Sequence, residues 1–328
     1  VVTPDENGTV VLNVTPDVGP NEIKVTLTNS SKYNNTENAT VVDIESNPNY
    51  DIGLNVTTAP YGENTTITVQ VPPELKDNVT VKIDGVEYLI TVDDNGIGVL
   101  NVSNLTAGKH NVTVSTGDKN YTAKDNFTEF TIPKQAPDMT IDVNGTTPGE
   151  DVVVTVTVGP NATGQVTITV DGLEHTVDVD PVTGTATYVI PDAQPGEHNV
   201  TAKYHGDSNY NASGVVGPKN FTVDKFNAAI ADVTVDVHDY NNSATVTVTL
   251  NVTDAEGTVN IKVGNQNVTV NVTKGVATLE LGPLGWNENV TLNVTYSGDS
   301  KYHGNKTNKT VELGLMKNAT IDINVVPI

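Results

Sequence analysis

The chain has 328 residues, of which 17% are charged and only 5% are aromatic. Forty Asp and Glu residues stand against 17 Lys, for a formal net charge of −23, which argues against electrostatic binding to nucleic acid or anionic lipid. The chain has no Cys, which excludes disulfides, thiolate zinc sites and cysteine nucleophiles. No stretch reaches the roughly 18 continuous apolar residues of a membrane span, so we expect any leader or anchor to have been removed or to lie outside this sequence.

Alternation of apolar residues with Thr or Asn dominates the chain from its start, and this period of two predicts half-buried β-strands. Residues 1–45 predict only three strands, near 9–14, 22–27 and 39–44, which would be the last three strands of a domain. Complete units of about 90 residues follow at 46–134, 135–225 and 226–316. The final segment, 317–328, matches only the opening strand of a further unit.

The second complete unit has the clearest pattern. We predict strands there at 139–145, 151–158, 165–170, 173–179, 184–190, 197–205 and 218–223, separated by Gly, Pro and Asp turn signals. Seven short antiparallel strands in this length predict an all-β, two-layer sandwich. The links between units, at 133–135 and 224–226, are short, so we expect tandem sandwiches arranged as a rod.

One motif recurs near the end of each unit, as Tyr-x-Gly-Asp-Ser-x-Tyr in the two best copies. The copy at 116–121 lacks the first Tyr, and the copy ending at Tyr33 lacks Gly-Asp. We expect Gly to allow a turn, Asp to cap loop amides and the Tyr rings to close the end of the sandwich, although a ligand site on the two Asp residues is the alternative. The residues of the motif are Tyr204, Gly206, Asp207 and Tyr210 in one copy, and Tyr296, Gly298, Asp299 and Tyr302 in the other.

With these motifs, the repeats resemble the bacterial and archaeal immunoglobulin-like (Ig-like) domains of large surface proteins. The chain resembles in particular the Asn- and Thr-rich adhesin-like proteins of methanogenic archaea, over essentially all 328 residues. The resemblance implies an immunoglobulin-type sandwich fold and a role in a cell-surface stalk or fibre.

The two partial units allow two interpretations. Either the sequence is a segment of a longer array, or chains assemble head to tail, with strand 317–328 of one subunit completing the N-terminal unit of the next. In the second case, the assembly residues would be Ile321, Ile323 and Val325.

The sequence contains 27 Asn-x-Ser/Thr triplets, whereas roughly seven would arise by chance. In a strand, the Asn and Thr of Asn-Val-Thr share one face, so an inward Val directs the acceptor outward. We therefore expect covalent N-glycans and an extracellular location, although Val/Thr-rich strands also favour such triplets. The candidate sites are Asn55, Asn64, Asn78, Asn101, Asn111, Asn126, Asn161, Asn199, Asn220, Asn251, Asn267, Asn271, Asn293 and Asn318.

No catalytic or cofactor motif is present, and the six His residues do not form a metal-ligand pattern. We predict no enzyme activity and no cofactor. Ca²⁺ remains an alternative, because carboxylates cluster at 93–94, 178–180 and 236–239, with Asp138 and Asp224 between units. Lys-to-Asn or Lys-to-Asp isopeptide bonds are a further alternative, but Lys24, Lys82, Lys203 and Lys262 are expected to face outward.

The sequence thus predicts a non-enzymatic extracellular structural protein whose partners are its own copies or neighbouring repeats, with no nucleic acid and no direct membrane insertion. Two alternatives stay open: a self-assembling filament subunit, and a glycan- or host-binding adhesin module. A loop at 282–288 with the only Trp, Trp286, is the one sequence feature that could indicate the binding module, although we favour packing of its ring.

Overall fold

All regular structure in the described part of the protein is β-structure. The computed structural model describes residues 1–75, 79–238, 243–285 and 289–313, and within these ranges every element is a strand. None of the described residues forms a helix long and apolar enough to cross a membrane. The all-β class predicted from the period-two pattern is therefore confirmed.

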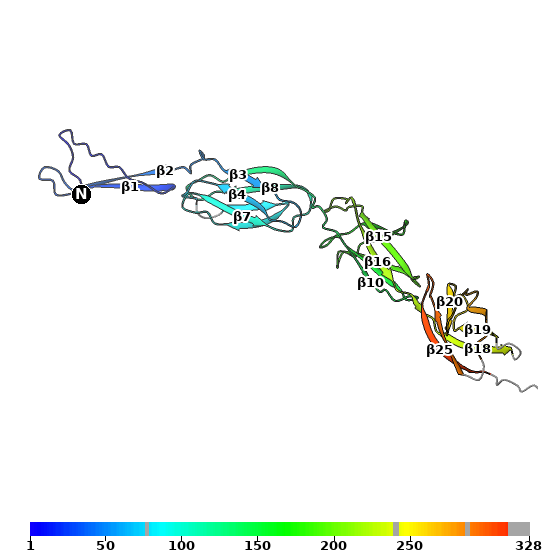
Figure 1. Ribbon diagram of the computed structural model, residues 1–328. Helices are drawn as coiled ribbons and strands as arrows, with labels where there is room; N and C mark the ends of the chain where they lie inside the picture. The colour runs from blue at the N-terminus through cyan, green and yellow to red at the C-terminus, as the bar shows by residue number, and fades with distance from the viewer. Residues whose placement is uncertain (76–78, 239–242, 286–288, 314–328) are drawn as a thin grey trace, which may run out of the picture. The chain divides into compact units, whose positions relative to one another are not determined.

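The N-terminal segment forms a two-stranded hairpin, β1 (Gly19–Leu27) with β2 (Thr36–Ile44). Figure 1 draws it in blue, as a single antiparallel ribbon. The prediction of a strand at 9–14 is wrong, because these residues have no ladder partner and their apolar side chains are exposed. An alternating pattern becomes a strand only where a neighbouring backbone pairs with it.

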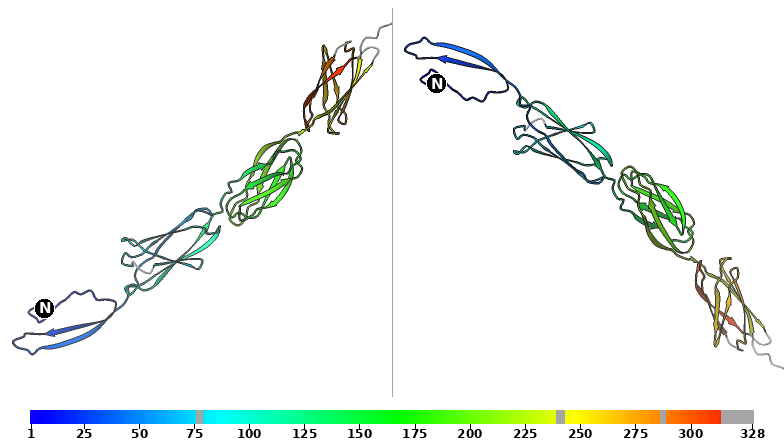
Figure 2. Two further views of the ribbon diagram at one scale, coloured as in Figure 1. Left: turned by 90° about the horizontal axis from the view of Figure 1, so that it is seen from below. Right: turned by 90° about the horizontal axis from the view of Figure 1, so that it is seen from above.

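Residues 53–132 fold into a two-layer sandwich of seven strands. One sheet has the order β3-β4-β7 and the other β6-β5-β8-β9; Figure 2 shows the two layers from two further sides. The strands are β3 (Gly53–Thr57), β4 (Thr65–Gln70), β5 (Val79–Ile83), β6 (Val86–Ile90), β7 (Ile97–Val102), β8 (Gly108–Thr116) and β9 (Lys124–Ile132).

The next sandwich repeats this topology, with sheets β10-β11-β14 and β13-β12-β15-β16. Its seven strands fall on the seven segments predicted from the sequence. They are β10 (Thr140–Asn144), β11 (Val152–Thr157), β12 (Gln165–Val170), β13 (Leu173–Asp178), β14 (Thr185–Ile190), β15 (Gly196–Tyr204) and β16 (Val215–Val223).

The last sandwich has sheets β18-β19-β22 and β21-β20-β23-β25, with a short parallel pair, β17 and β24, at its entrance. The strands are β17 (Phe226–Asn227), β18 (Ile230–His238), β19 (Ser243–Leu250), β20 (Thr258–Val263), β21 (Gln266–Asn271), β22 (Val276–Leu281), β23 (Asn289–Tyr296), β24 (Tyr302–His303) and β25 (Asn305–Glu312). The chain thus folds as tandem Ig-like β-sandwiches.

Small aliphatic side chains build each core. In β11, Val152, Val154 and Val156 are fully buried, while Val153 and Thr155 between them are half-buried on the opposite face. The Thr hydroxyl stays accessible to water on that face, and the β-branched carbon stiffens the strand. The composition therefore suits sheets that are buried on one side only.

A glycine turn precedes the last strand of the three-stranded sheet in every sandwich. Gly96, Gly184 and Gly275 have φ of 77°, 68° and 77°. A Cβ on any of them would collide with a backbone carbonyl oxygen, that of Val71 in the case of Gly96. Only glycine fits this position.

Candidate functional site

The recurring motif forms a loop closed by an Asp carboxylate. We call residues 117–121, 206–210 and 298–302 the Gly-Asp loops. In each loop, Asp Oδ1 accepts hydrogen bonds from the backbone N–H groups two and three positions later. The donor–acceptor distances are 2.6 and 2.8 Å at Asp118, 2.7 and 2.6 Å at Asp207, and 2.8 and 2.7 Å at Asp299. Gly206 and Gly298, with φ of 83° and 73°, permit the turn before the Asp.

The first Tyr of the motif anchors the strand before the loop. Tyr204 and Tyr296 are buried; the Tyr204 hydroxyl donates to the carbonyl of Thr163 at 2.7 Å, and the Tyr296 hydroxyl donates to Asp299 Oδ2 at 3.1 Å. Burial and this carboxylate raise the pKa of Tyr296, so its hydroxyl remains a donor.

The second Tyr of the motif closes the loop itself. Tyr302 donates from its hydroxyl to Asp254 Oδ1 at 2.6 Å, and Tyr210 packs edge-on against Tyr61 with 5.6 Å between the ring centroids. Both second tyrosines are buried.

Each Gly-Asp loop holds the segment by which the chain enters a sandwich. The entering residues Asn47, Gln135 and Phe226 pair in parallel with Tyr121, Tyr210 and Tyr302, respectively. Their N–H groups donate to loop carbonyls at 2.7, 2.9 and 2.9 Å. We call a Gly-Asp loop with its entering residue an entry clamp.

A lysine strengthens two of the three entry clamps. Lys134 Nζ donates to the carbonyl oxygen of Asp207, and Lys225 Nζ to that of Asp299, each at 2.5 Å. Asp224, just before Lys225, pairs with His303 Nε2 at 2.9 Å. Three successive residues, Asp224, Lys225 and Phe226, are therefore bonded to the loop 298–303, which fixes the entering backbone at several points.

The carboxylate of Asp299 is strongly stabilised in its ionised form. Burial alone would raise its pKa, but the N–H groups of Glu256, Tyr302 and Lys301 outweigh that effect and hold the pKa below its usual value. A carboxylate that accepts several backbone amides acts as a structural cap, since its lone pairs are already occupied.

His110 and His198 each bond to the Asp of a hairpin turn. His198 Nδ1 lies 2.7 Å from Asp171 Oδ2, and its Nε2 lies 2.9 Å from the carbonyl oxygen of Gln194. Both partners only accept hydrogen bonds, so the ring satisfies both contacts as an imidazolium. Burial lowers the pKa of His198, but these bonds outweigh it and raise the pKa above its usual value. His110 makes the same contacts with Asp84 and Thr106.

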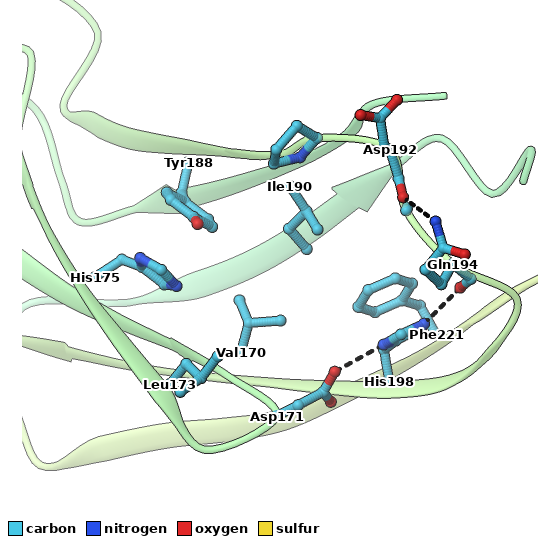
Figure 3. A pocket seen from close by; sticks show the side chains of 12 residues that line it. Val170, Asp171, Leu173, His175, Tyr188, Ile190, Asp192, Gln194, His198 and Phe221 are labelled. Atoms are coloured by element: carbon cyan, nitrogen blue, oxygen red, sulfur yellow. Dashed lines mark hydrogen bonds and ion pairs between the residues drawn. The ribbon is translucent and has the colours of Figure 1, made fainter. Parts of the chain in front are cut away.

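A groove opens between β13 and β14 of the sandwich at 140–223. It has a volume of about 300 Å³ and is lined mainly by apolar side chains and aromatic rings. In Figure 3, the rings of His175 and Tyr188 lie side by side, and their centroids are 4.0 Å apart. Leu173 also lines the groove. Gln194 and the His198–Asp171 pair provide its polar side.

The last sandwich closes the equivalent groove with one side chain. Gln266, at the position of Leu173, accepts from the N–H of Gly282 at 2.9 Å and donates to the carbonyl of Pro283 at 3.0 Å. In the sandwich at 140–223, Leu173 cannot form these bonds, and Pro191, at the position of Gly282, has no N–H. The open groove therefore distinguishes that sandwich from the last one.

The candidate glycosylation sites are mostly exposed. Among the twelve that lie in the described residues, eleven are exposed and Asn126 is half-buried. The Asn126 amide donates to the carbonyl of Ile52 at 2.7 Å, so its nitrogen is engaged. Asn199 donates to Asp171 at 3.3 Å. Asn78 and Asn318 fall outside the described residues.

The acidic clusters serve as local caps. Asp93 accepts from the N–H groups of Asn95 and Ile97, Asp180 from that of Val182, and Asp178 from the side chain of Gln165. No group of three or more acidic or His side chains suited to a metal ion occurs within the described residues. Trp286, Asp239 and the assembly residues Ile321, Ile323 and Val325 lie outside them.

Comparison with known protein families finds a match for one of the sandwiches. Residues 139–224 match the family described as bacterial Ig-like domain (group 3). That segment contains a bacterial Ig-like domain. Its seven strands, β10–β16, have the same sheet order as those of the sandwich at 53–132. No curated protein matches the chain.

Several solved structures are similar to the chain. An adhesin described as Ca²⁺-stabilised, with which an Antarctic bacterium binds ice, has 17% identity and a TM-score of 0.37, over 90% of this chain and 81% of that one. A tetra-tandem repeat from the extending region of a large adhesion protein has 20% identity and a TM-score of 0.37, over 80% and 73% of the two chains. A segment of titin has 13% identity and a TM-score of 0.36, over 81% and 99%.

The sequence pattern alone did not reveal the entry clamps or the groove. The Gly-Asp motif was visible, but its partner lies about 75 residues earlier, in a link where two of the three copies share only a Lys. A signal for the His–Asp pair was present: Asp171 and His198 are both replaced in the last unit, by Gly264 and Val290.

Proposed function

We propose that the chain is a non-enzymatic structural segment of a cell-surface protein, serving as an extracellular stalk or fibre that carries N-glycans. The observation that carries this proposal is the entry clamp, built in the same way at three successive sandwiches. A repeated device that fixes the entering backbone suits a protein that bears tension along its chain.

The sheet topology supports the same role. In each sandwich the first strand and the last strand belong to different sheets, as β10 and β16 do. A pull on the two ends therefore has to break the entry clamp and slide one buried sheet face past the other, which opposes extension. Nothing in this arrangement requires a catalytic residue.

Exposed sequons support the extracellular and glycosylated parts of the proposal. Asn55, Asn267 and Asn293 lie on strands with their side chains exposed, next to inward Val residues. Glycans at such positions would shield strand edges from other chains. The bacterial Ig-like domain at 139–224 is consistent with a surface protein.

Single-molecule stretching of the whole chain tests the mechanical role. We expect three discrete unfolding steps, each releasing about 30 nm, because roughly 90 residues extend by about 3.5 Å each. Lys225→Ala should lower the force of one step, whereas Lys262→Ala, at an exposed strand position, should not. Gradual extension without steps would contradict the proposal.

Peptide mapping of protein from its native cells tests the glycans, and bare Asn at every exposed site would contradict that part.

A second function, ligand binding, is favoured by the open groove at Leu173 and Tyr188. An aromatic and apolar lining with polar groups on one side suits the face of a sugar ring. Binding of the chain to an array of glycans tests this function, with Leu173→Gln combined with Pro191→Gly as the variant, since Gln266 and the N–H of Gly282 close the equivalent groove. Binding that this double variant leaves unchanged, or no binding at all, would rule out the groove as a glycan site.

A further inference from the structure

Three Asn-Gly dipeptides occur in the chain, at 7–8, 95–96 and 144–145. In such a dipeptide, the backbone nitrogen of Gly can attack the side-chain amide of the preceding Asn, because no Cβ on the Gly hinders the approach. The attack requires an unbonded Gly N–H and a backbone that can move, so hydrogen bonds that hold the Gly amide oppose it. The three dipeptides differ in these bonds.

The second dipeptide is locked in a turn. The Gly96 N–H donates to the carbonyl oxygen of Asp93 at 2.9 Å, and the Gly96 carbonyl accepts from the N–H of Val71 at 2.9 Å. Asp93 Oδ1 also accepts from the N–H groups of Asn95 and Ile97, at 2.9 and 2.8 Å. Gly96 is buried, so its N–H is both bonded and shielded from water.

The first dipeptide lies in a turn with the same bonds but without the packing. The Gly8 N–H donates to the carbonyl oxygen of Asp5 at 3.0 Å. Asp5 Oδ1 accepts from the N–H groups of Asn7 and Thr9, at 2.9 and 2.8 Å. Every residue of this turn is exposed, so we expect it to open more readily than the turn at Asp93.

The third dipeptide follows strand β10 and has no such turn. Among the residues that the structure describes, neither the Gly145 N–H nor the Asn144 side chain has a hydrogen-bond partner. Both residues are exposed, so the nitrogen is open to solvent base and the Asn side chain is free to rotate. Thr146 comes next, so Asn144 also begins an Asn-x-Thr triplet.

We propose that Asn144 is a site of spontaneous deamidation through a succinimide, and that the bonded turn keeps Asn95 intact. Solvent hydroxide takes the proton of the Gly145 N–H, the nitrogen bonds to Asn144 Cγ, and Nδ2 leaves as ammonia with a proton from water. Water then opens the succinimide at one of its two carbonyls and gives Asp or isoaspartate. The net change is the exchange of one ammonia for one water, which needs no oxidant and no cofactor.

The reaction has two consequences at this position. It removes Nδ2, the atom to which an N-glycan would be attached, so a deamidated Asn144 no longer accepts one. The isoaspartyl product adds a methylene to the backbone just before Thr146, whose carbonyl accepts from the N–H of Asp224 at 3.0 Å. The inference goes beyond the proposed function and stands whether or not the chain carries glycans.

Incubation of the folded, unglycosylated chain in mildly alkaline buffer tests the proposal, with peptide mapping by mass spectrometry at successive times. We expect Asn144 to convert at least about tenfold faster than Asn95, with Asn7 between them. In urea, the three sites should convert at rates within about threefold of one another, because each has the same Gly neighbour and none has a turn. A ratio of the Asn144 rate to the Asn95 rate that is no larger in the folded chain than in urea would overturn the proposal.

Two variants test whether the turns protect their Asn residues. Asp93→Ala removes the side-chain acceptor of the turn at Asn95, and thermal unfolding checks that this variant is folded. Asp5→Ala does the same at Asn7, in a segment outside the three sandwiches. We expect each variant to raise the rate at its own Asn by about threefold or more and to leave the rate at Asn144 unchanged. Unchanged rates at Asn95 and Asn7 would overturn the protective role of the turns.

Discussion

The backbone N–H of Phe226 donates a hydrogen bond of 2.9 Å to the carbonyl oxygen of Lys301. Phe226 is the last residue of the link at 224–226, and Lys301 lies in the Gly-Asp loop of the sandwich that follows. In each sandwich, the residue at which the chain enters is therefore held by a Gly-Asp loop from near the end of the same sandwich's sequence. One carboxylate, that of Asp299, accepts the hydrogen bonds that hold this loop closed.

Asp299→Ala should destabilise the last sandwich by about 2 kcal/mol, because three backbone amides lose a charged acceptor. Asp299→Asn should cost less, since its Oδ1 still accepts. Thermal unfolding of the chain measures the effect, and Asp236→Ala, at an exposed position in β18, is the matched control. Equal losses for Asp299→Ala and Asp236→Ala would show that the loop is not held by the carboxylate.

The His198–Asp171 pair should make stability depend on pH. The pKa of His198 is raised above its unfolded value, so its contribution is complete below about pH 6.5 and is lost as the pH rises through the folded pKa. The pKa of Asp171 is lowered: burial raises it, but the bonds to His198 and Asn199 outweigh this, so its contribution is lost only in acid. We expect the melting temperature of this sandwich to fall between pH 6 and pH 9.

The chain itself supplies the control for that pH dependence. Replacing the pair by the residues of the last sandwich, Asp171→Gly with His198→Val, should flatten the dependence between pH 6 and pH 9. The contribution of His110 and Asp84 to the sandwich at 53–132 should persist in the same melting curve. An unchanged slope for the sandwich at 140–223 would show that the pair does not titrate as inferred.

Thr116→Val should stabilise the sandwich at 53–132 by about 1 kcal/mol. Thr116 is 4% exposed, and its Oγ1 is buried without a hydrogen-bond partner in the described part of the protein. Valine has nearly the same shape and no group to leave unpaired. Chemical denaturation measures the gain, with Thr113→Val, at a half-buried position of the same strand, as the comparison. A loss of stability in Thr116→Val would indicate that the hydroxyl has a partner in solution.

Asn126→Ala should destabilise the same sandwich by about 1 kcal/mol, because the carbonyl of Ile52 loses its donor. Asn293→Ala, at an exposed sequon, should change the stability of the last sandwich by less than about 0.5 kcal/mol. If the folded chain is the glycosylated form, occupancy should follow the same order and be lower at Asn126 than at Asn293. Glycans on Asn126 at full occupancy would contradict this order.

The sequence by itself determined the class of fold and the place of most strands. Val152, Val154 and Val156 alternate with polar or half-buried neighbours, and the pleat of a strand turns that alternation into one buried face whatever the partner is. Gly206 and Asp207 likewise predict a capped turn, because the φ of glycine and the reach of the Asp side chain are local properties.

Only the tertiary structure decided what those local features contact. Residues 9–14 are as rich in β-branched and apolar residues as a strand, yet they form none, because a ladder needs a second backbone that the pattern does not specify. Gln135 and Tyr210 pair although neither residue indicates the other in sequence. The groove at Leu173 is open and that at Gln266 is closed because of bonds across two strands. Local periodicity is set by neighbours along the chain, whereas pairing and closure depend on contacts between distant segments, which the folded structure alone brings together.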